Sequence, residues 1–130
     1  MPMQVGWSEI GWLAAAGALG TLARFGLAGL ASRISSGEYP WGTLAVNALG
    51  CFLFGLVWML AEDRMLISGR TRFIVLTGFM GAFTTFSTFA YETAALARDS
   101  QWLLSVANLL AHNVGGVALV FLGMAVGRLL

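Results

Sequence analysis

The sequence has no lysine, a single cysteine, two prolines and few charges of either sign. Charged residues make up only 10% of the 130 residues, and the seven positive charges are all arginine. A water-soluble domain needs a charged surface, which this composition does not supply. The single cysteine, Cys51, excludes an intrachain disulfide and a cysteine-cluster metal site. A net charge of +1 leaves no basic patch, so we expect no nucleic-acid partner.

The sequence is instead rich in hydrophobic residues, which make up 58% of the chain and gather in long uncharged runs. Four runs are long enough for a helix to cross a bilayer core of about 30 Å. The runs are Ile10–Ala31, Trp41–Ala61, Phe73–Ala97 and Trp102–Gly127. Short connections make neighbouring spans antiparallel. The sequence therefore predicts one all-α membrane domain over residues 1–130, with four transmembrane helices.

The third run contains a stretch that forms helix poorly, Gly78–Phe89, with the sequence GFMGAFTTFSTF. Its glycines lower helix propensity, its threonines are β-branched, and its hydroxyls compete for backbone hydrogen bonds. One interpretation is a helix break at membrane depth, and such breaks commonly hold ions. The other is a kinked helix packed through small residues.

Polar side chains are placed deep in the second and fourth spans. Asn47 is the only strongly polar group of the second span. It either joins two helices by a hydrogen bond or offers a donor to an anion. In the fourth span Ser105, Asn108 and His112 share one helical face, which is either a solvated lumen or a seam between helices.

A phenylalanine stripe runs through the poorly helical stretch as Phe83, Phe86 and Phe89. Such a stripe is usually packing, but here it alternates with threonine and serine. The positive edge of a phenyl ring stabilises an anion without the deep trap that a buried arginine creates. Both interpretations stay open at this point.

Two charged residues lie inside the spans, Glu92 in the third and Arg24 in the first. An intramembrane carboxylate is a functional candidate, although Glu92 is also near enough to the end of its span to be an interfacial anchor. Arg24 either snorkels, fixes the end of a helix or attracts anions to a pore mouth. No catalytic triad, metal-ligand cluster or phosphate loop is present, so we expect no enzyme.

The arginines give little information about membrane orientation. Four lie on the side of the N-terminus and three on the other side: Arg64, Arg70, Arg72 and Arg128 against Arg24, Arg33 and Arg98. Such a weak bias fits insertion in both orientations, or one orientation chosen by local charge.

Three motifs, GALGTLARF at 17–25, GTLAVNALG at 42–50 and GFMGAFTTFSTF at 78–89, together resemble the Fluc/CrcB family of small fluoride channels. The resemblance covers all four spans. It implies a passive fluoride-selective channel that exports fluoride across a bacterial inner or plasma membrane. It further implies a dual-topology, antiparallel homodimer with two pores and a third helix broken in the membrane.

The resemblance also implies roles for individual residues. A structural sodium ion at the dimer centre would be held by the backbone carbonyls of Gly81 and Thr84. The implied anion pathway comprises Asn47, Phe86, Ser87, Thr88, Phe89 and Glu92. We add Asn108 and His112 to this pathway because of the polar face that they share in the fourth span, and we assign Arg24 as a structural or pore-mouth charge from its place in the first span. One departure is Ala82, which replaces a common second glycine.

Two other functions are compatible with four short spans. A proton-coupled exporter like the small multidrug transporters needs a carboxylate deep in the first span, whereas Glu9 lies at its edge. A membrane assembly subunit would have no flux of its own.

Overall fold

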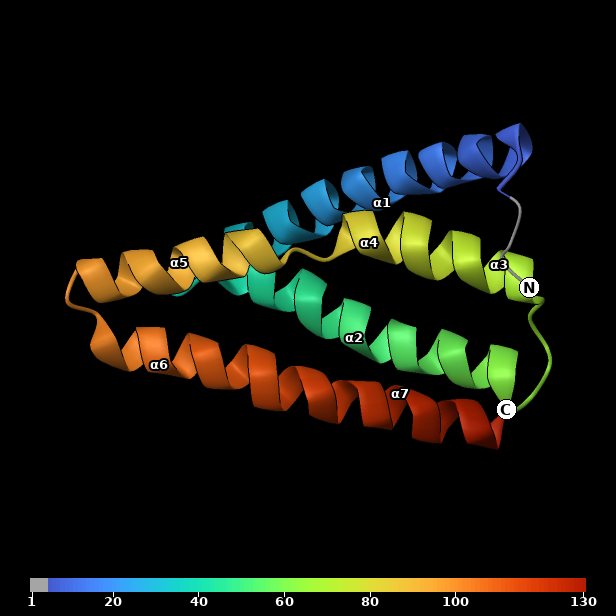
Figure 1. Cartoon of the computed structure of the whole chain (residues 1–130). Helices are drawn as coiled ribbons and strands as arrows, with labels where there is room; N and C mark the ends of the chain where they lie inside the picture. Colours follow the sequence, from blue (N-terminus) through green and yellow to red (C-terminus); the bar gives the residue numbers. More distant parts are fainter. Residues whose placement is uncertain (1–4) are drawn as a thin grey trace.

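The computed structural model describes residues 5–130, and the described chain contains four helical spans that are long and apolar enough to cross a membrane. The first is α1 (Trp7–Ile34) and the second is α2 (Trp41–Glu62) (Figure 1). The third covers Gly69–Arg98 and the fourth Trp102–Leu129. The prediction of an all-α, multi-pass membrane protein is confirmed.

The first span extends three residues beyond the predicted run at each end. Glu9 in the first turn accepts a hydrogen bond from the backbone N–H of Gly6 (3.0 Å). A side-chain acceptor at this place satisfies one of the N–H groups that a helix start leaves free. The helix therefore begins among polar residues, ahead of the hydrophobic run by which we had delimited the span.

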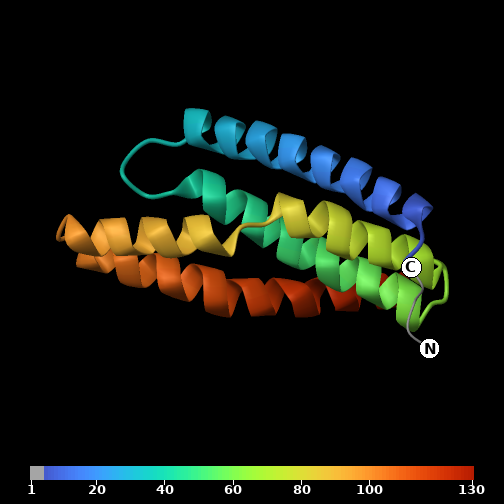
Figure 2. The ribbon, with the colours of Figure 1, turned by 45° about the horizontal axis from the view of Figure 1, so that its top comes forward.

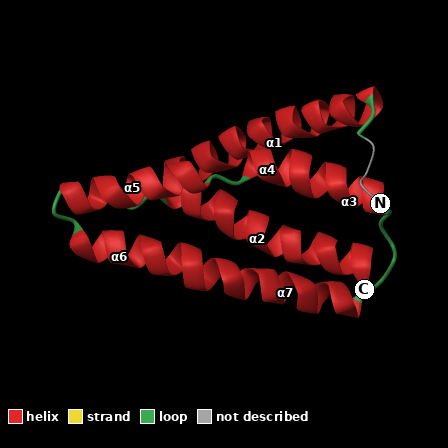
Figure 3. Ribbon diagram, viewed as in Figure 1, coloured by secondary structure: helices red, strands yellow, loops and turns green. Residues whose placement is uncertain are grey.

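The third span is broken in its middle. Its first half consists of α3 (Gly69–Phe73), the π-helical segment η1 (Ile74–Met80) and the short α4 (Gly81–Phe83). Thr84 and Thr85 are extended, with φ/ψ of −89°/158° and −147°/111°, and α5 (Phe86–Arg98) follows. Figure 3 shows this interruption as a loop between two helices. The predicted helix break is confirmed, and the alternative of a kinked helix is wrong.

The fourth span is continuous, but its backbone hydrogen bonds change from the α-helical to the π-helical pattern in its middle. It consists of α6 (Trp102–Leu110), the π-helical segment η2 (Ala111–Gly115) and α7 (Gly116–Leu129). The sequence analysis did not anticipate η2. Such π-helical turns occur frequently at functional sites, and this one contains His112.

The helices pack around α2, with α1 on one side and α7 on the other, while α6 packs against α5 (Figure 2). The most extensive contact joins α2 to α7, where Gly55 and Gly123 bring the two backbones together. A Cβ atom at either glycine would overlap backbone of the other helix. Beside the break, Val46, Leu76, Met80 and Phe83 form a buried cluster between α2 and the third span.

One end of the bundle holds the start of α1, the end of α7 and the connection between α2 and α3 (Figure 1). There Arg70 pairs with Glu9 at 3.1 Å, and Arg72 pairs with Glu62. Arg72 also lies over the ring of Trp58, 4.8 Å from its centroid. These contacts tie the start of the third span to α1 and α2.

Candidate functional site

The broken segment is held by one side chain of α2. Asn47 donates from Nδ2 to the carbonyl of Thr85 (3.0 Å), and the backbone N–H of Thr85 donates to Asn47 Oδ1 (2.8 Å). The amide thus replaces both helical partners that Thr85 loses at the break. Asn47 therefore joins two helices, as one of the two interpretations predicted. Its Nδ2 carries a second N–H, which remains for another acceptor.

The threonines of the break supply further replacement bonds. The Thr85 hydroxyl accepts from the backbone N–H of Thr88 (3.3 Å) and caps α5. The same hydroxyl donates to the Thr88 hydroxyl (2.9 Å), and the Thr84 hydroxyl donates to the Met80 carbonyl (3.0 Å). Threonine oxygens at a helix start are common N-caps. The residues that make this stretch a poor helix are the ones that stabilise its interruption.

The break redirects the N–H groups that would serve two carbonyls in a regular helix. Gly81 would accept from Thr85, which instead donates to Asn47. Thr84 would accept from Thr88, which instead donates to the Thr85 side chain. Gly81 is exposed, and apart from its chain neighbours and its own helix, no described residue lies within 4 Å of the place where its Cβ would be. The carbonyl oxygens of Gly81 and Thr84 are hard ligands, the kind that suits an alkali cation.

Side chains do not offer a rival metal site in the part of the chain that the structure describes. Within residues 5–130, no three His, Cys, Asp or Glu side chains gather where they could hold a metal ion.

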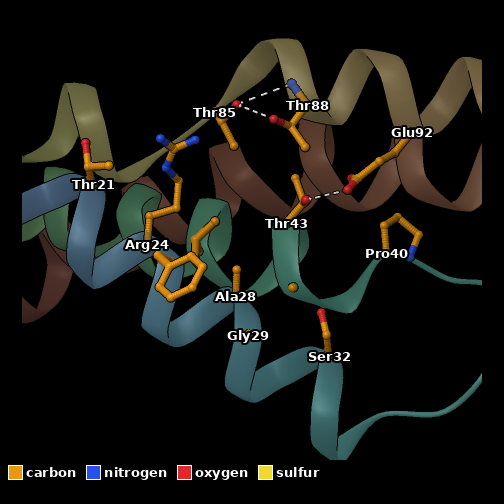
Figure 4. Close-up of a pocket in the computed structure, with 13 residues that line it drawn as sticks. Thr21, Arg24, Ala28, Gly29, Ser32, Pro40, Thr43, Thr85, Thr88 and Glu92 are labelled. Carbon is orange, nitrogen blue, oxygen red and sulfur yellow. Dashed lines mark hydrogen bonds between the residues drawn. The ribbon is translucent and has the colours of Figure 1, made fainter.

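A first cavity, of about 510 Å³, lies between α1, α2 and the start of α5; we call it the arginine cavity (Figure 4). Arg24, Thr43, Thr88 and Glu92 are among the residues that line it. Thr43 donates its hydroxyl to Glu92 Oε1 (2.7 Å), while Glu92 Oε2 is buried with no hydrogen-bond partner among the described residues. The guanidinium of Arg24 points toward the broken segment. Arg24 thus contributes a positive charge to this cavity.

A second cavity, of about 420 Å³, lies on the other side of the break; we call it the phenylalanine cavity. Phe86 and Phe89 line it with their ring centroids 5.5 Å apart and their planes at 62°. Phe89 is buried, whereas Phe86 is 77% exposed in the single chain. The Phe89 ring also stacks on His112, with centroids 4.3 Å apart. The three phenylalanines of the stripe therefore have different environments. Phe83 lies in the buried cluster, whereas Phe86 and Phe89 line a cavity.

Thr85 is the one residue that lines both cavities, and Asn47 lines the phenylalanine cavity. The hydrogen-bonded pair of Asn47 and Thr85 therefore lies at the junction between the cavities.

Most of the predicted anion-pathway residues line one of the two cavities, but Ser87 and Asn108 line neither. Ser87 is exposed, like its neighbour Phe86. Asn108 is fully buried and donates to the Thr93 hydroxyl (2.9 Å). Ser105 donates to the Thr93 carbonyl (2.9 Å). Ser105 and Asn108 therefore form a seam between α5 and α6, although Asn108 Oδ1 is buried without a partner among the described residues.

Two residues of the site were missed by the sequence analysis. Thr43 bonds Glu92, and Thr93 is the partner of both Ser105 and Asn108. The position of Thr43, four residues before Asn47 and so on the same helical face, was the available signal. No comparable signal pointed to Thr93.

Comparison with known proteins places this architecture in a family. Residues 11–124 match the family model described as CrcB-like protein, Camphor Resistance (CrcB). The chain belongs to the CrcB family. A relative from Nitrosococcus oceani is 54% identical over 124 residues, which cover 95% of this CrcB chain and 99% of the relative. A relative from Solidesulfovibrio magneticus is 51% identical over 122 residues, covering 94% and 98%. Both relatives bear the name fluoride-specific ion channel FluC.

The range matched by the CrcB family model contains the break and both cavities. It leaves out the ion-paired Glu9 at one end and Arg128 at the other.

Proposed function

We propose that this CrcB chain is a fluoride-selective channel that lets fluoride leave the cytoplasm passively across the bacterial inner or plasma membrane. The observation that carries the proposal is the polar junction of Asn47 and Thr85, with an arginine cavity on one side and a phenylalanine cavity on the other. The high identity to relatives named as fluoride channels supports the same conclusion.

The donors at the junction suit a small, strongly hydrated anion. A pore for fluoride must replace many hydrogen bonds to water and still release the ion. The second N–H of Asn47 is one donor. The Thr88 hydroxyl is another, since it accepts from Thr85 and makes no donated hydrogen bond within residues 5–130. The ring edges of Phe86 and Phe89 add weak positive potential without a fixed charge.

Arg24 and Glu92 belong to the mouth of this pathway. The arginine raises the local concentration of anions in its cavity. Glu92 positions the Thr43 hydroxyl on the opposite wall. We assign Ser87 to the surface that the partner protomer covers and Asn108 to the support of His112.

The working unit that we propose is an antiparallel homodimer with one sodium ion at its centre and two pores. Gly81 and Phe86 are exposed in the single chain, and the break redirects the helical donors of two carbonyls. Backbone oxygens at membrane depth need a partner. A second copy would bring its own Gly81 and Thr84 carbonyls opposite the first pair, and the four oxygens would hold the cation.

Fluoride efflux from liposomes containing the purified chain, measured with a fluoride electrode, tests the channel. We expect rapid fluoride release and far slower chloride release. Chloride flux as large as fluoride flux would refute the assignment. Exchanging all sodium for N-methylglucamine tests the cation, because the dimer should then lose thermal stability and flux; equal stability in both media would contradict it.

The geometry gives no support to a proton-coupled exporter. The acid of α1, Glu9, lies in the first turn and is paired with Arg70 at the end of the bundle. Dependence of transport on a proton gradient would favour the exporter again. A purified chain without flux, bound tightly to another membrane protein, would favour an assembly subunit.

A further inference from the structure

His112 is held in one orientation by two contacts on opposite parts of its ring. Nδ1 lies 3.0 Å from the backbone carbonyl of Asn108, and the ring face stacks on Phe89 with a centroid distance of 4.3 Å. A carbonyl oxygen can only accept a hydrogen bond, so Nδ1 must carry a proton. The atom that gains or loses a proton in this orientation is therefore Nε2.

Nε2 is buried and has no hydrogen-bond partner among the described residues, although His112 lines the phenylalanine cavity. In the neutral ring Nε2 is a bare acceptor, which repels an anion. A buried polar atom without a partner calls for an explanation such as a water molecule or an ion. The π-helical turn η2 contains this residue, and such turns occur frequently at functional sites.

The surroundings of His112 contain few other groups that titrate. On α2 the backbone carbonyl of Thr43 lies near the ring, where it competes with an anion for the ring proton, and Cys51 lines the same cavity. On α5, Glu92 lies one turn beyond Phe89 and is bonded to Thr43. The other charged residues of the packed helices lie at helix ends: Glu62, Arg98 and Arg128. Within residues 5–130, no fixed positive charge on the packed helices takes the place of a proton on Nε2.

Protonation changes this side of the cavity in two ways. Nε2 becomes an N–H donor, and the ring becomes a cation stacked on the face of Phe89. A cation over the face of an aromatic ring is attracted by the negative charge of that face. It also draws electron density from the ring, so the phenyl edge turned to the cavity becomes more positive.

We propose that His112 is a proton-dependent ligand for the permeating anion in the phenylalanine cavity. When protonated it donates Nε2–H to fluoride, and when neutral it withholds this donor, so fluoride flux rises as the pH falls. The inference rests on the proposed channel function.

The first test measures fluoride efflux from liposomes at equal pH on both sides, with protein-free liposomes to subtract leakage of HF. For a histidine with an ordinary pKa of about 6.5, flux should rise by up to about tenfold from about pH 7.5 to about pH 5.5. His112→Gln should remove this pH dependence and hold flux at or below the level of the wild type at high pH. Cys51→Ser should keep the ratio between the two pH values.

The second test observes the proton directly, because the sequence contains one histidine. In the ¹⁵N-histidine NMR spectrum of the wild-type protein, the neutral ring should carry its proton on Nδ1. Added fluoride, but not chloride, should move the titration midpoint to higher pH, since the anion binds the protonated form. A purely structural histidine would show no such shift.

The outcomes separate this inference from the channel function. Fluoride flux that is the same at every pH, with an NMR midpoint that fluoride does not move, would overturn the role of His112 and leave the channel intact. A His112→Gln variant with the slope of the wild type would overturn it equally. Absence of fluoride flux at all pH values would overturn both.

Discussion

The third and fourth spans both leave the regular α-helix near their middle, yet they resolve the disturbance differently. In the fourth span, the carbonyls of Asn108 and Leu109 are bonded by His112 Nδ1 and Asn113 Nδ2 from the next turn of the same span. In the third span, Thr85 obtains both of its backbone partners from Asn47 on another helix. The fourth span repairs itself locally, whereas the third depends on its neighbours.

This difference suits the role of each span: the fourth presents a side chain to a cavity, and the third exposes backbone oxygens. A wide turn that satisfies its own backbone can present a side chain to a cavity without help. A full break exposes backbone oxygens, which is tolerated at membrane depth only inside protein or against an ion. The third span therefore needs hydrogen-bond partners from other helices and, in the proposed dimer, from a second copy of the chain.

The largest expected effect comes from Asn47→Ala, which removes both bonds that hold the break. Each unsatisfied backbone group costs about 1–3 kcal/mol, so the folded state should lose roughly 2–6 kcal/mol and fluoride flux should disappear. Thermal unfolding in detergent and liposome efflux measure the two effects. Asn47→Asp keeps an acceptor for Thr85 N–H and should be more stable than Asn47→Ala. Wild-type stability of Asn47→Ala would contradict the dependence of the break on α2.

Gly50→Ala should displace the break, because the added methyl would overlap the Thr84 methyl group. Overpacking of this kind costs about 1–3 kcal/mol. We expect a lower unfolding temperature together with reduced flux. Gly115→Ala is the matched control in the fourth span, since its Cβ would meet no atom within 4 Å. If both variants behaved alike, the contrast between the spans would be lost.

Replacing the cavity rings should reduce flux while the protein stays folded. Loss of a ring interaction worth about 0.5–1.5 kcal/mol corresponds to up to roughly tenfold in flux. Phe89→Ile should reduce fluoride flux more than Phe86→Ile, because the Phe89 ring also stacks on His112. Phe121→Ile, at an exposed position of α7, serves as the control. Unchanged flux in both cavity variants would remove the role of the ring edges.

The smallest effect is expected for Asn113→Ala in the fourth span. Asn113 is exposed and bonds the Leu109 carbonyl, so its loss should cost about 0.5–1.5 kcal/mol and leave flux near that of the wild type. A loss as large as that of Asn47→Ala would mean that η2 also depends on remote support.

Local features of the sequence were sufficient for the spans and for the break. Hydrophobic runs long enough to cross a bilayer predict four helices wherever they occur. Glycine and threonine weaken a helix through their own backbone and side-chain preferences, so Gly78–Phe89 could be identified without knowledge of its neighbours. The same preferences gave no indication of η2, whose bonds depend on which side chains reach back to Asn108 and Leu109.

The candidate site was predicted in part. Its asparagine and the charges at 24 and 92 stood out because polar groups are costly at membrane depth. Its phenyl rings stood out because they alternate with threonine and serine. The sequence analysis left open whether Asn108 faces a lumen or a seam. That choice depends on Thr93, which lies 15 residues away on another helix.

By itself, the sequence determined the membrane class, the four spans and the position of the interruption, because these follow from the hydropathy and backbone preferences of adjacent residues. Only the tertiary structure decided that Asn47 meets Thr85 across 38 residues and that Thr43 meets Glu92 across 49. It also decided that the break separates two cavities. Hydrogen-bond partners so far apart in the chain are chosen by how the helices pack, and local preference carries no record of that choice.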